Sequence, residues 1–407
     1  MRIAFLTPLW PVSLAQNGIA TYVDTMRRAL ENKGHECVIL AMRTLDDELR
    51  DPGLFPVGRP PRGFAETQIN RVRAALSDQY FDYDYGRRRL VHTLIEAHRQ
   101  KPIDIFEAEE SFGLPLTSVG ATSAPVVIRS HGPHFLVKQP PHQRPDLQRI
   151  AEERRAYEAA DAASFPSGAL RDAVSSRYGL NFPVCAAYPN PIDIAPANEG
   201  WTLDGCDRNT ILFVGRFDSL KGADLALKAF DAALERFPQA RLVMAGADHG
   251  VDGPDGTTLN FPDFIAANLS ERARSRIEFL GRVPRENIPG LRRQALISLS
   301  ASRYETFPYD VTEALALGAP TVTSATPGLS EYLVDGEETL FAPVGDAASL
   351  QARIEQCLAN PDYAAQIGAA GRRAAERMFA PEAIADAALG FFEQVIEAAQ
   401  RRKAAQP

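Results

Sequence analysis

The sequence lacks paired cysteines, long apolar runs and an excess of basic residues. Its four cysteines, Cys37, Cys185, Cys206 and Cys357, are scattered, so we expect reduced thiols rather than disulfides or a zinc site. No run approaches the roughly 18 apolar residues of a membrane span. The strand-like start of the chain, residues 1–8, is too short for the core of a signal peptide. These absences predict a cytoplasmic protein without a metal site.

The charge balance argues against a nucleic-acid partner, because 44 basic and 52 acidic side chains give a net charge of −8. Arginines nevertheless gather locally between residues 59 and 89, near several aromatic residues. Such a group could form a surface for peripheral contact with the inner face of a membrane or for an acidic acceptor, but an ordinary solvated face is the reading we favour. The residues are Arg59, Arg62, Arg71, Arg73, Arg87, Arg88 and Arg89, with Tyr80, Phe81, Tyr83 and Tyr85.

A Gly-x-Gly-x-x-Gly turn is also missing after the leading strand of each half, which disfavours a nicotinamide dehydrogenase. What the chain does contain is a regular alternation of strand-like and helix-like runs, typical of α/β domains with parallel sheets. A long loop is predicted from about Asp51 to Phe64, which is rich in Pro, Gly and Arg. The first predicted elements are a strand from Arg2 to Thr7, a helix from about Ile19 to Lys33 and a strand from Cys37 to Ala41, followed by strands at Ile103–Phe106, Val126–Arg129, Ala162–Phe165 and Val184–Ala187.

A break in composition from Pro189 to Asp207 predicts a linker, after which a second series of strands and helices starts at Ile211. With 407 residues, the chain is long enough for two domains that each bury their own core. We therefore predict an N-terminal domain over residues 1–195 and a C-terminal domain over residues 206–384, with helical sequence closing the chain.

Two glutamates eight positions apart, Glu305 and Glu313, are the most informative feature of the second half. The run Leu296–Ser300 resembles a buried strand, and a helix is predicted from Tyr309 with Pro308 in its first turn. Both carboxylates would then border the positive end of a helix, where free N–H groups can bind an anion such as a diphosphate. Carboxylates beside an anion site suit a ligand with phosphates and hydroxyls, such as a nucleotide sugar. The alternative for Glu305 is a helix cap.

A second signal lies in the run from Thr210 to Gly222, which leads from an apolar strand through a short polar loop into a helix. It places Arg216 and Lys221 at the carboxyl end of a strand. An arginine fork and a lysine point charge are suited to a diphosphate leaving group, because negative charge grows on its bridging oxygen as the glycosidic bond breaks.

Together these motifs resemble the retaining glycosyltransferases of family GT4, which have the two-domain GT-B fold. The resemblance covers essentially the whole chain and depends on the order and spacing of many short motifs. They are Asn17-Gly18, His131-Gly132, Pro189-Asn-Pro-Ile-Asp193, Gly215-Arg216, Lys221-Gly222, Leu280-Gly-Arg-Val283, the two glutamates with seven residues between them, Gly328-Leu-Ser-Glu331, Leu333-Val-Asp-Gly336 and Pro343-Val-Gly-Asp346.

The resemblance implies two Rossmann-like domains facing across a crevice, with a last helix of about residues 385–407 crossing back onto the N-terminal, acceptor-side domain. Arg216 and Lys221 would neutralise the diphosphate, and Glu313 would bind the ribose hydroxyls. Glu305 would bind hydroxyls of the donor sugar beside the anomeric carbon, and His131 would reach the same sugar from the first domain. The remaining donor-binding positions would be Gly18, Arg282, Val283, Thr306 and Phe307.

The implied activity is transfer of a hexosyl residue from a UDP- or GDP-type sugar to a sugar, lipid-linked or small-molecule hydroxyl, in the synthesis of a cell-surface or secreted polysaccharide. The departing phosphate would deprotonate the acceptor, and neither a metal nor another cofactor is expected. A nucleophilic Glu305 is the rival mechanism, which the sequence leaves open. Other chemistry on a sugar nucleotide, such as epimerisation, and non-catalytic binding are the alternative functions.

Three departures from the family pattern affect loops. Pro308 stands where many members have Gly and removes one N–H that could face the ligand. Pro191 replaces Gly at the predicted junction, and Glu338-Thr339 replaces an Asn-Gly pair. In the first half, Glu107, Glu109 and Glu110 follow a predicted strand, where they could face an acceptor or form a solvated loop.

Overall fold

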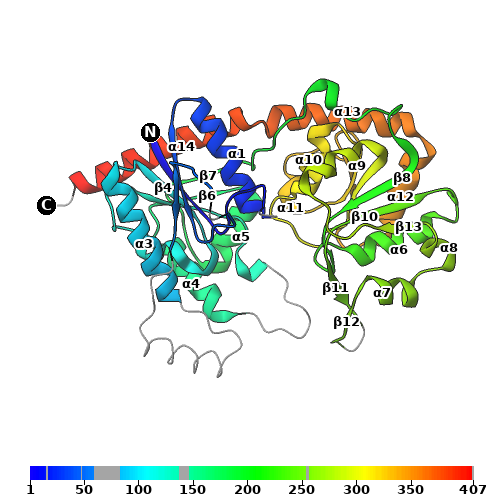
Figure 1. The fold of residues 1–407 in the computed structure, drawn as a ribbon, viewed down its shortest axis with the longest axis horizontal. Helices are drawn as coiled ribbons and strands as arrows, with labels where there is room; N and C mark the ends of the chain where they lie inside the picture. The colour runs from blue at the N-terminus through cyan, green and yellow to red at the C-terminus, as the bar shows by residue number, and fades with distance from the viewer. Residues whose placement is uncertain (15–16, 47, 59–82, 137–145, 254–255, 406–407) are drawn as a thin grey trace. The chain divides into compact units, whose positions relative to one another are not determined.

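The computed structural model of the chain describes residues 1–14, 17–46, 48–58, 83–136, 146–253 and 256–405. These residues divide into two units by their contacts (Figure 1). The first unit comprises the described residues of Met1–Val137, Arg144–Asn190 and Pro381–Pro407. The second comprises those of Pro191–Ala380.

The first unit is built on one sheet, whose strands in spatial order are β3 (Leu54–Pro56), β2 (Glu36–Ala41), β1 (Arg2–Thr7), β4 (Ile105–Glu109), β5 (Val126–Arg129), β6 (Ala162–Phe165) and β7 (Cys185–Ala187). Every pair of neighbours is parallel. The strand order reverses between β1 and β4, which is the signature of a doubly wound, Rossmann-like sheet.

The helices of the first unit are α1 (Gly18–Asn32), α3 (Tyr83–Gln100), α4 (Leu147–Ala159), α5 (Gly168–Tyr178) and α14 (Pro381–Ala404), with 3-10 turns at Ser111–Ser118 and His134–Leu136. Although α14 is last in the chain, it packs beside α1, and Phe392 and Val395 join Met26 in one buried cluster. An ion pair of 2.8 Å between Lys33 and Asp386 also joins the two helices.

The second unit has a six-stranded parallel sheet in the order β13 (Ile277–Phe279), β10 (Arg241–Ala245), β8 (Asp207–Val214), β14 (Ala295–Ser300), β15 (Thr321–Ser324) and β16 (Leu340–Ala342). Its order reverses between β8 and β14, so it is also Rossmann-like. A small additional sheet contains β9 (Phe217–Asp218), β11 (Asp248–Asp252) and β12 (Thr258–Leu259). The connections after β8 and β14 therefore lie side by side at the carboxyl edge, where ligands bind in such sheets.

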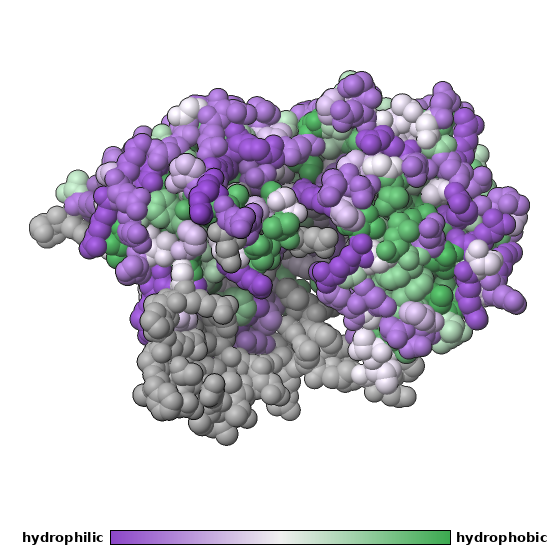
Figure 2. Space-filling view, in the orientation of Figure 1, coloured by the Kyte–Doolittle hydropathy of each residue, from purple (hydrophilic) through white to green (hydrophobic). Residues whose placement is uncertain are grey.

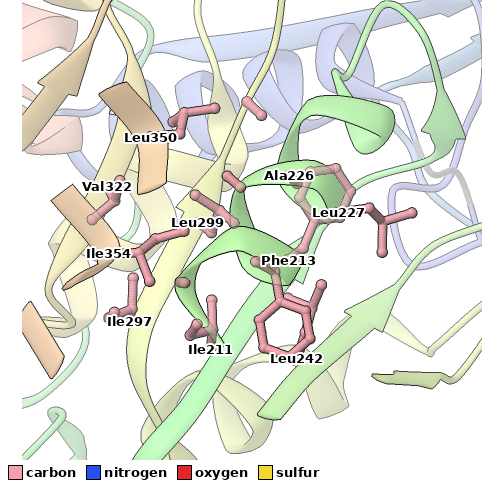
Figure 3. Close-up of a cluster of buried hydrophobic side chains, with 14 of the residues drawn as sticks. Ile211, Phe213, Ala226, Leu227, Leu242, Ile297, Leu299, Val322, Leu350 and Ile354 are labelled. Atoms are coloured by element: carbon pink, nitrogen blue, oxygen red, sulfur yellow. The ribbon is translucent and has the colours of Figure 1, made fainter. Parts of the chain in front are cut away.

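The helices of the second unit are α6 (Ala223–Ala233), α7 (Phe261–Asn268), α8 (Glu271–Arg274), α9 (Ile288–Gln294), α10 (Tyr309–Leu317), α11 (Pro327–Ser330), α12 (Ala347–Ala359) and α13 (Pro361–Met378), with 3-10 turns at Ala197–Glu199 and Arg285–Asn287. Its core lies between the central strands and helices α6 and α12 (Figure 3). Phe213 and Leu299 from the strands pack there with Leu227 and Ile354 from the helices. Burial of each such side chain contributes about 1.5–3 kcal/mol.

The predicted α/β class and the two Rossmann-like folds are confirmed. β14 is buried along its whole length, as the run Leu296–Ser300 indicated. Two local predictions were wrong. Within the predicted loop from Asp51, residues 54–56 form β3, which pairs with β2, while residues 59–64 lie outside the described residues. Helix α10 begins at Tyr309, so Pro308 is its N-cap residue rather than part of its first turn.

The segment predicted as a linker is not free-standing from Pro191 onward. The Trp201 main-chain N–H donates to the carbonyl of Leu317, and its indole N–H donates to that of Ala295. The Ile192 N–H likewise donates to the carbonyl of Phe379. These bonds fasten the segment to the second unit, because main-chain groups removed from water need partners.

In the described part of the arginine-rich segment, Arg87 and Arg89 have structural roles, whereas Arg88 is exposed, as expected for a solvated face. Arg87 is buried, pairs with Glu152 and donates to the carbonyl of Gly113. Arg89 donates to the carbonyls of Val57 and Gly58. The earlier members of the group, Arg59, Arg62, Arg71, Arg73, Tyr80 and Phe81, lie outside the described residues.

In Figure 2, hydrophilic residues cover much of the visible surface of both units, and apolar residues gather where Figure 1 draws β10 and β13. A cavity of about 580 Å³ lies along these strands and β8, lined by residues that include Leu212, Val243 and Leu280. Across the described residues, we find no helix with the length and apolar character needed to cross a membrane.

Candidate active site

The connection after β8 carries the two predicted cations and is packed tightly against the connection after β14. Gly222 is the N-cap residue of α6 and has a φ of 67°, in the left-handed region. A Cβ atom at this position would lie 1.8 Å from the carbonyl oxygen of Ala301. Only glycine permits both this conformation and this approach, so Gly222 allows the two connections to touch.

Arg303 fastens the same two connections together by hydrogen bonds. Its guanidinium makes a two-point contact with Asp224, at 2.6 and 2.8 Å, and donates to the carbonyl of Ser219 at 2.6 Å. Its main-chain N–H donates to the carbonyl of Leu220. Two-point arginine–carboxylate contacts are geometrically specific, so the loop that carries Lys221 is held in one position.

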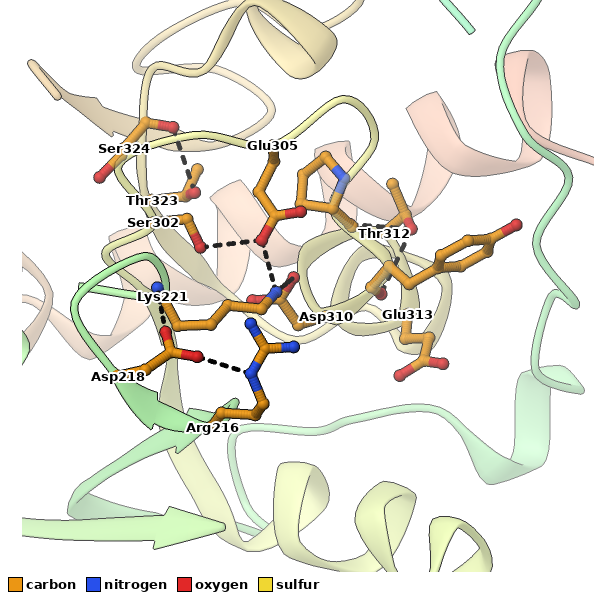
Figure 4. A network of polar contacts seen from close by, with 12 residues as sticks. Arg216, Asp218, Lys221, Ser302, Glu305, Asp310, Thr312, Glu313, Thr323 and Ser324 are labelled. Carbon is orange, nitrogen blue, oxygen red and sulfur yellow. Dashed lines mark hydrogen bonds and ion pairs between the residues drawn. The ribbon is translucent and has the colours of Figure 1, made fainter. Parts of the chain in front are cut away.

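Lys221 is the centre of the site's charge network (Figure 4). Its ammonium nitrogen lies 2.6 Å from Glu305 Oε1 and 3.5 Å from Asp310 Oδ1, and its side chain is 18% exposed. Burial alone would lower the pKa of Lys221, but the Asp310 and Glu305 carboxylates outweigh burial and raise this pKa above its ordinary value. The lysine is therefore held in its charged form between two carboxylates from the β14 side.

Arg216 joins this network through Asp218. The Arg216 guanidinium donates to Asp218 Oδ2 at 2.5 Å, and Asp218 Oδ1 accepts the main-chain N–H of Lys221 at 2.7 Å. In Figure 4 the Arg216 and Lys221 side chains converge, with their charged ends toward Asp310. The structure thus brings both predicted cations together with Glu305.

The two glutamates occupy different surroundings. Glu305 lies in the loop and Glu313 on the helix, as the sequence indicated. Glu305 accepts from the Ser302 hydroxyl at 3.1 Å as well as from Lys221. Glu313 instead pairs with Arg285 at 3.4 Å and with the buried Arg292 at 3.3 Å. The two carboxylates therefore belong to separate charge networks on one helix and its preceding loop.

The remaining predicted donor-binding positions of the second unit differ in exposure. Arg282 is exposed, and Val283 and Thr306 are partly exposed, in the connections after β13 and β14. The Phe307 side chain is buried against Phe379, so only its main chain could face a ligand.

In the first unit, His131 follows β5, and its ring packs edge-on against Tyr22 at 4.9 Å between ring centroids. Burial, and then the neighbouring Arg129 charge, lower the pKa of His131 well below its ordinary value. Gly18 is the exposed first residue of α1, after Asn17, whose side chain caps the helix by accepting from Ile19 and Ala20. The predicted helix start near Ile19 is therefore close to the observed one.

Neither reading of the three glutamates in the first unit was correct, because all three are buried. Glu107 and Glu109 lie within β4, and Tyr22 donates to Glu107 at 2.8 Å. Glu110 accepts the main-chain N–H groups of His131 and Gly132 at 2.9 and 2.6 Å. A buried carboxylate therefore shapes the loop that carries His131.

Sequence reasoning missed Asp218, Asp310 and Arg303, and it missed the role of Glu110. Asp310 lies five positions after Glu305 at a predicted helix start, and this position was the available signal. The contacts of Arg303 and Glu110 join segments distant in the sequence. Within the described ranges, we find no cluster of three or more His, Cys, Asp or Glu side chains that could hold a metal ion.

Comparison with known proteins identifies relatives for both halves. The model of "Glycosyltransferase Family 4" matches residues 16–195, and that of "Glycosyl transferases group 1" matches residues 204–374. Mannosylfructose-phosphate synthase from Agrobacterium fabrum is 34% identical over 151 residues, which cover 36% of this chain and 32% of that protein. Glycogen synthase from Mycobacterium tuberculosis is 24% identical over 92% of this chain and 90% of that protein. The chain thus spans about a third of the first of these relatives.

Solved structures show the same fold over nearly the whole chain. Sucrose-phosphate synthase from Thermosynechococcus elongatus has a TM-score of 0.72 at 20% identity, covering 98% of this chain and 99% of that one. Anabaena HepE in complex with UDP and glucose has a TM-score of 0.65 at 16% identity, covering 98% and 100%. Because one family model matches each Rossmann-like unit and the solved structures share the fold over nearly the whole chain, the chain belongs to the family 4 and group 1 glycosyltransferases and has the GT-B fold.

Proposed function

We propose that the protein transfers a hexosyl residue from a nucleoside-diphosphate sugar to an acceptor hydroxyl with retention of anomeric configuration, in the synthesis of a cell-surface or secreted polysaccharide. The observation that carries the proposal is the network of Arg216, Lys221 and Glu305 at the strand-order reversal of the second sheet. Anabaena HepE, which shares the fold, is described in complex with UDP-glucose, and this supports a nucleotide sugar as the donor class.

In this proposal Arg216 and Lys221 bind the diphosphate. Two cations on one short connection can stabilise the negative charge that develops on the leaving oxygen, and this stabilisation speeds the reaction. The ion pair with Glu305 holds the Lys221 ammonium at the carboxyl edge of the sheet before the donor arrives. The lysine then needs little reorganisation to meet the phosphate.

Glu305 is proposed to accept hydrogen bonds from the donor sugar, and Glu313 from the ribose. A nucleophilic Glu305 is less favoured, because one of its oxygens already accepts from both Lys221 and Ser302, which lowers its electron density. In the favoured mechanism the acceptor oxygen bonds to the anomeric carbon on the face from which the phosphate leaves. The acceptor proton passes to the departing phosphate oxygen, so no protein base and no metal are required.

The roles that the resemblance gives to Gly18, His131, Arg282, Val283 and Thr306 remain predictions. Phe307 differs from these residues, because its side chain is buried and only its main chain could contact the donor. A cytoplasmic location and peripheral contact with a membrane also remain predictions.

Thermal unfolding with a panel of UDP, GDP and their sugars tests the proposal directly. A ligand at 100 times its dissociation constant should stabilise the protein by about 2.7 kcal/mol. Lys221→Ala should reduce this shift, whereas Lys228→Ala, which removes an exposed lysine from α6 in the same unit, should not. Product analysis by NMR should show the donor's anomeric configuration. Absence of a shift with every nucleotide, or an inverted product, would contradict the proposal.

A further inference from the structure

Asp310 is a third carboxylate of the Lys221 network. It lies in the first turn of α10, and its side chain is 10% exposed. Its Oδ1 atom is buried and has no hydrogen-bond donor within the described part of the chain, although the Lys221 ammonium lies 3.5 Å away. Figure 4 shows Asp310 approaching the ammonium from the helix while Glu305 approaches from the loop.

The three N–H groups of the Lys221 ammonium serve several acceptors at this point. One ammonium serves both Glu305 and Asp310. If Lys221 also binds the diphosphate, as proposed above, its protons are shared with the phosphate oxygens. Buried carboxylate oxygens need hydrogen-bond donors, so the ligand itself must supply them. Hydroxyl groups of the donor sugar are donors of the right kind.

The backbone at the same position reinforces this preference. Pro308, the N-cap residue of α10, has no N–H to offer to a sugar oxygen. The turn therefore presents carboxylate acceptors where an N–H donor is missing. Two carboxylates with oxygens within 3.5 Å of one ammonium nitrogen can both lie against a single sugar ring.

We propose that Asp310 is a specificity-determining residue of the donor-sugar site: with Glu305 it accepts hydrogen bonds from sugar hydroxyls and excludes a sugar that carries a carboxylate. The donor is then a neutral hexose rather than the corresponding uronic acid, because like charges brought together at a desolvated site repel strongly. This inference rests on the proposed function, and it narrows the class of donor sugar.

A simpler role for Asp310 would be to stabilise the positive end of α10, as an acidic residue in a first helical turn commonly does. Such a role predicts an effect on folding stability that does not depend on the sugar. The proposed role predicts a change in the ratio between two donors. The ratio therefore separates the two explanations.

The experiment compares UDP-glucose with UDP-glucuronate, and GDP-mannose with GDP-mannuronate, as pairs that share a base and differ in sugar charge. Release of nucleoside diphosphate gives kcat/KM for each donor with wild type, Asp310→Asn and Asp263→Asn. Asp263 is the matched control, because it lies exposed in the first turn of α7 in the same unit. Thermal unfolding establishes that each variant is folded.

Wild type should prefer the neutral hexose, and Asp310→Asn should narrow that preference by about tenfold or more, mainly through better use of the uronate. Asp263→Asn should retain the wild-type ratio. An equal loss with both donors in Asp310→Asn, an unchanged ratio, or a wild-type preference for the uronate would overturn the inference and leave the proposed function standing. If no nucleotide sugar in the panel bound or reacted, the proposed function would fall as well.

Discussion

The Lys221 ammonium lies 2.6 Å from a carboxylate oxygen of Glu305 and so joins the connection after β8 to the connection after β14. The two residues follow strands that are neighbours in the sheet, although 84 positions separate Lys221 from Glu305 in the sequence. The ion pair therefore forms only in the folded protein. Substitutions can separate its contribution to folding stability from its contribution to sugar transfer.

Loss of either predicted diphosphate cation should slow transfer. We expect Arg216→Ala and Lys221→Ala each to lower kcat by roughly tenfold to a thousandfold, because each removes charge stabilisation that grows as the leaving group departs. Lys228→Ala is the control for charge loss in the same unit. Steady-state rates at saturating donor and acceptor check this, and near wild-type rates in folded Arg216 and Lys221 variants would show that the assignment is wrong.

Substitutions of Glu313 and Glu305 should affect different steps, nucleotide binding and sugar transfer respectively. Glu313→Gln should weaken binding of the free nucleoside diphosphate, whereas Glu305→Gln should reduce sugar transfer more than nucleotide affinity. Glutamine is the better replacement at position 313, because Glu313 supplies a carboxylate to Arg292, whose side chain is only 3% exposed. Calorimetric titration with nucleoside diphosphate measures the difference, with exposed Glu235→Gln as control. The same loss of affinity in both variants would refute this division.

Replacement of Gly222 should damage folding rather than chemistry alone. The new Cβ of Gly222→Ala would meet the Ala301 carbonyl oxygen at 1.8 Å in addition to requiring a φ of 67°. We expect a loss of stability above about 3 kcal/mol, compared with about 1 kcal/mol for Gly345→Ala. Gly345 also has a positive φ, of 86°, but open space around its Cβ position. Urea unfolding measures both, and equal losses would mean that the close approach is unimportant.

The stability of the first unit should fall as pH rises above about 5. Burial raises the pKa of Glu107 from 4.5 to about 7. The folded state therefore holds a proton that the unfolded state has released, and its stabilising effect is lost as pH rises through 7. Glu107→Gln should reduce the difference in Tm between pH 5 and pH 8 by a few degrees, while preserving an acceptor for Tyr22.

The control for that measurement is Glu36→Gln. Hydrogen bonds from Lys101 and then Arg2 lower the pKa of Glu36, so Glu36 titrates below the tested pH range. This variant should shift Tm by a similar amount at both pH values. Burial, together with Glu109 and Glu153, raises the pKa of Glu110 to about 8. Glu110 should therefore maintain part of the difference in Tm between pH 5 and pH 8 in the Glu107→Gln variant. If Glu107→Gln had the same difference in Tm between pH 5 and pH 8 as wild type, Glu107 would not be protonated in the folded protein.

The sequence was sufficient for the parts of the site that depend on local pattern. Alternating apolar residues predicted β14, and the residues after it placed Glu305 in a loop and Glu313 on a helix. The contacts between loops were not predictable in this way. Arg303 reaches Asp224 across 79 positions, and Glu110 reaches His131 across 21. Such pairs are set by strand order, which periodicity within one segment does not encode.

Buried charge was the other source of error. Glu107, Glu109 and Glu110 read as loop residues because carboxylates seldom lie inside a protein. Each of them accepts at least one hydrogen bond, Glu107 from the Tyr22 hydroxyl and Glu109 and Glu110 from main-chain N–H groups. Similarly, Arg87 was grouped with surface arginines but is buried beside Glu152. The polarity of a residue does not predict its exposure where a partner from elsewhere in the chain compensates the buried charge.

Because α14 packs beside α1, the order of synthesis differs from the order in which the units can be completed. The described residues of the second unit all lie between Pro191 and Ala380, so this unit can fold before the end of the chain is synthesised. The first unit begins earlier but exposes the apolar surface of Met26 and its neighbours until Phe392 and Val395 emerge. A chain that ends before residue 381 would therefore contain a complete second unit and an incomplete first unit with exposed apolar surface. We expect chaperones to bind this exposed surface of the first unit.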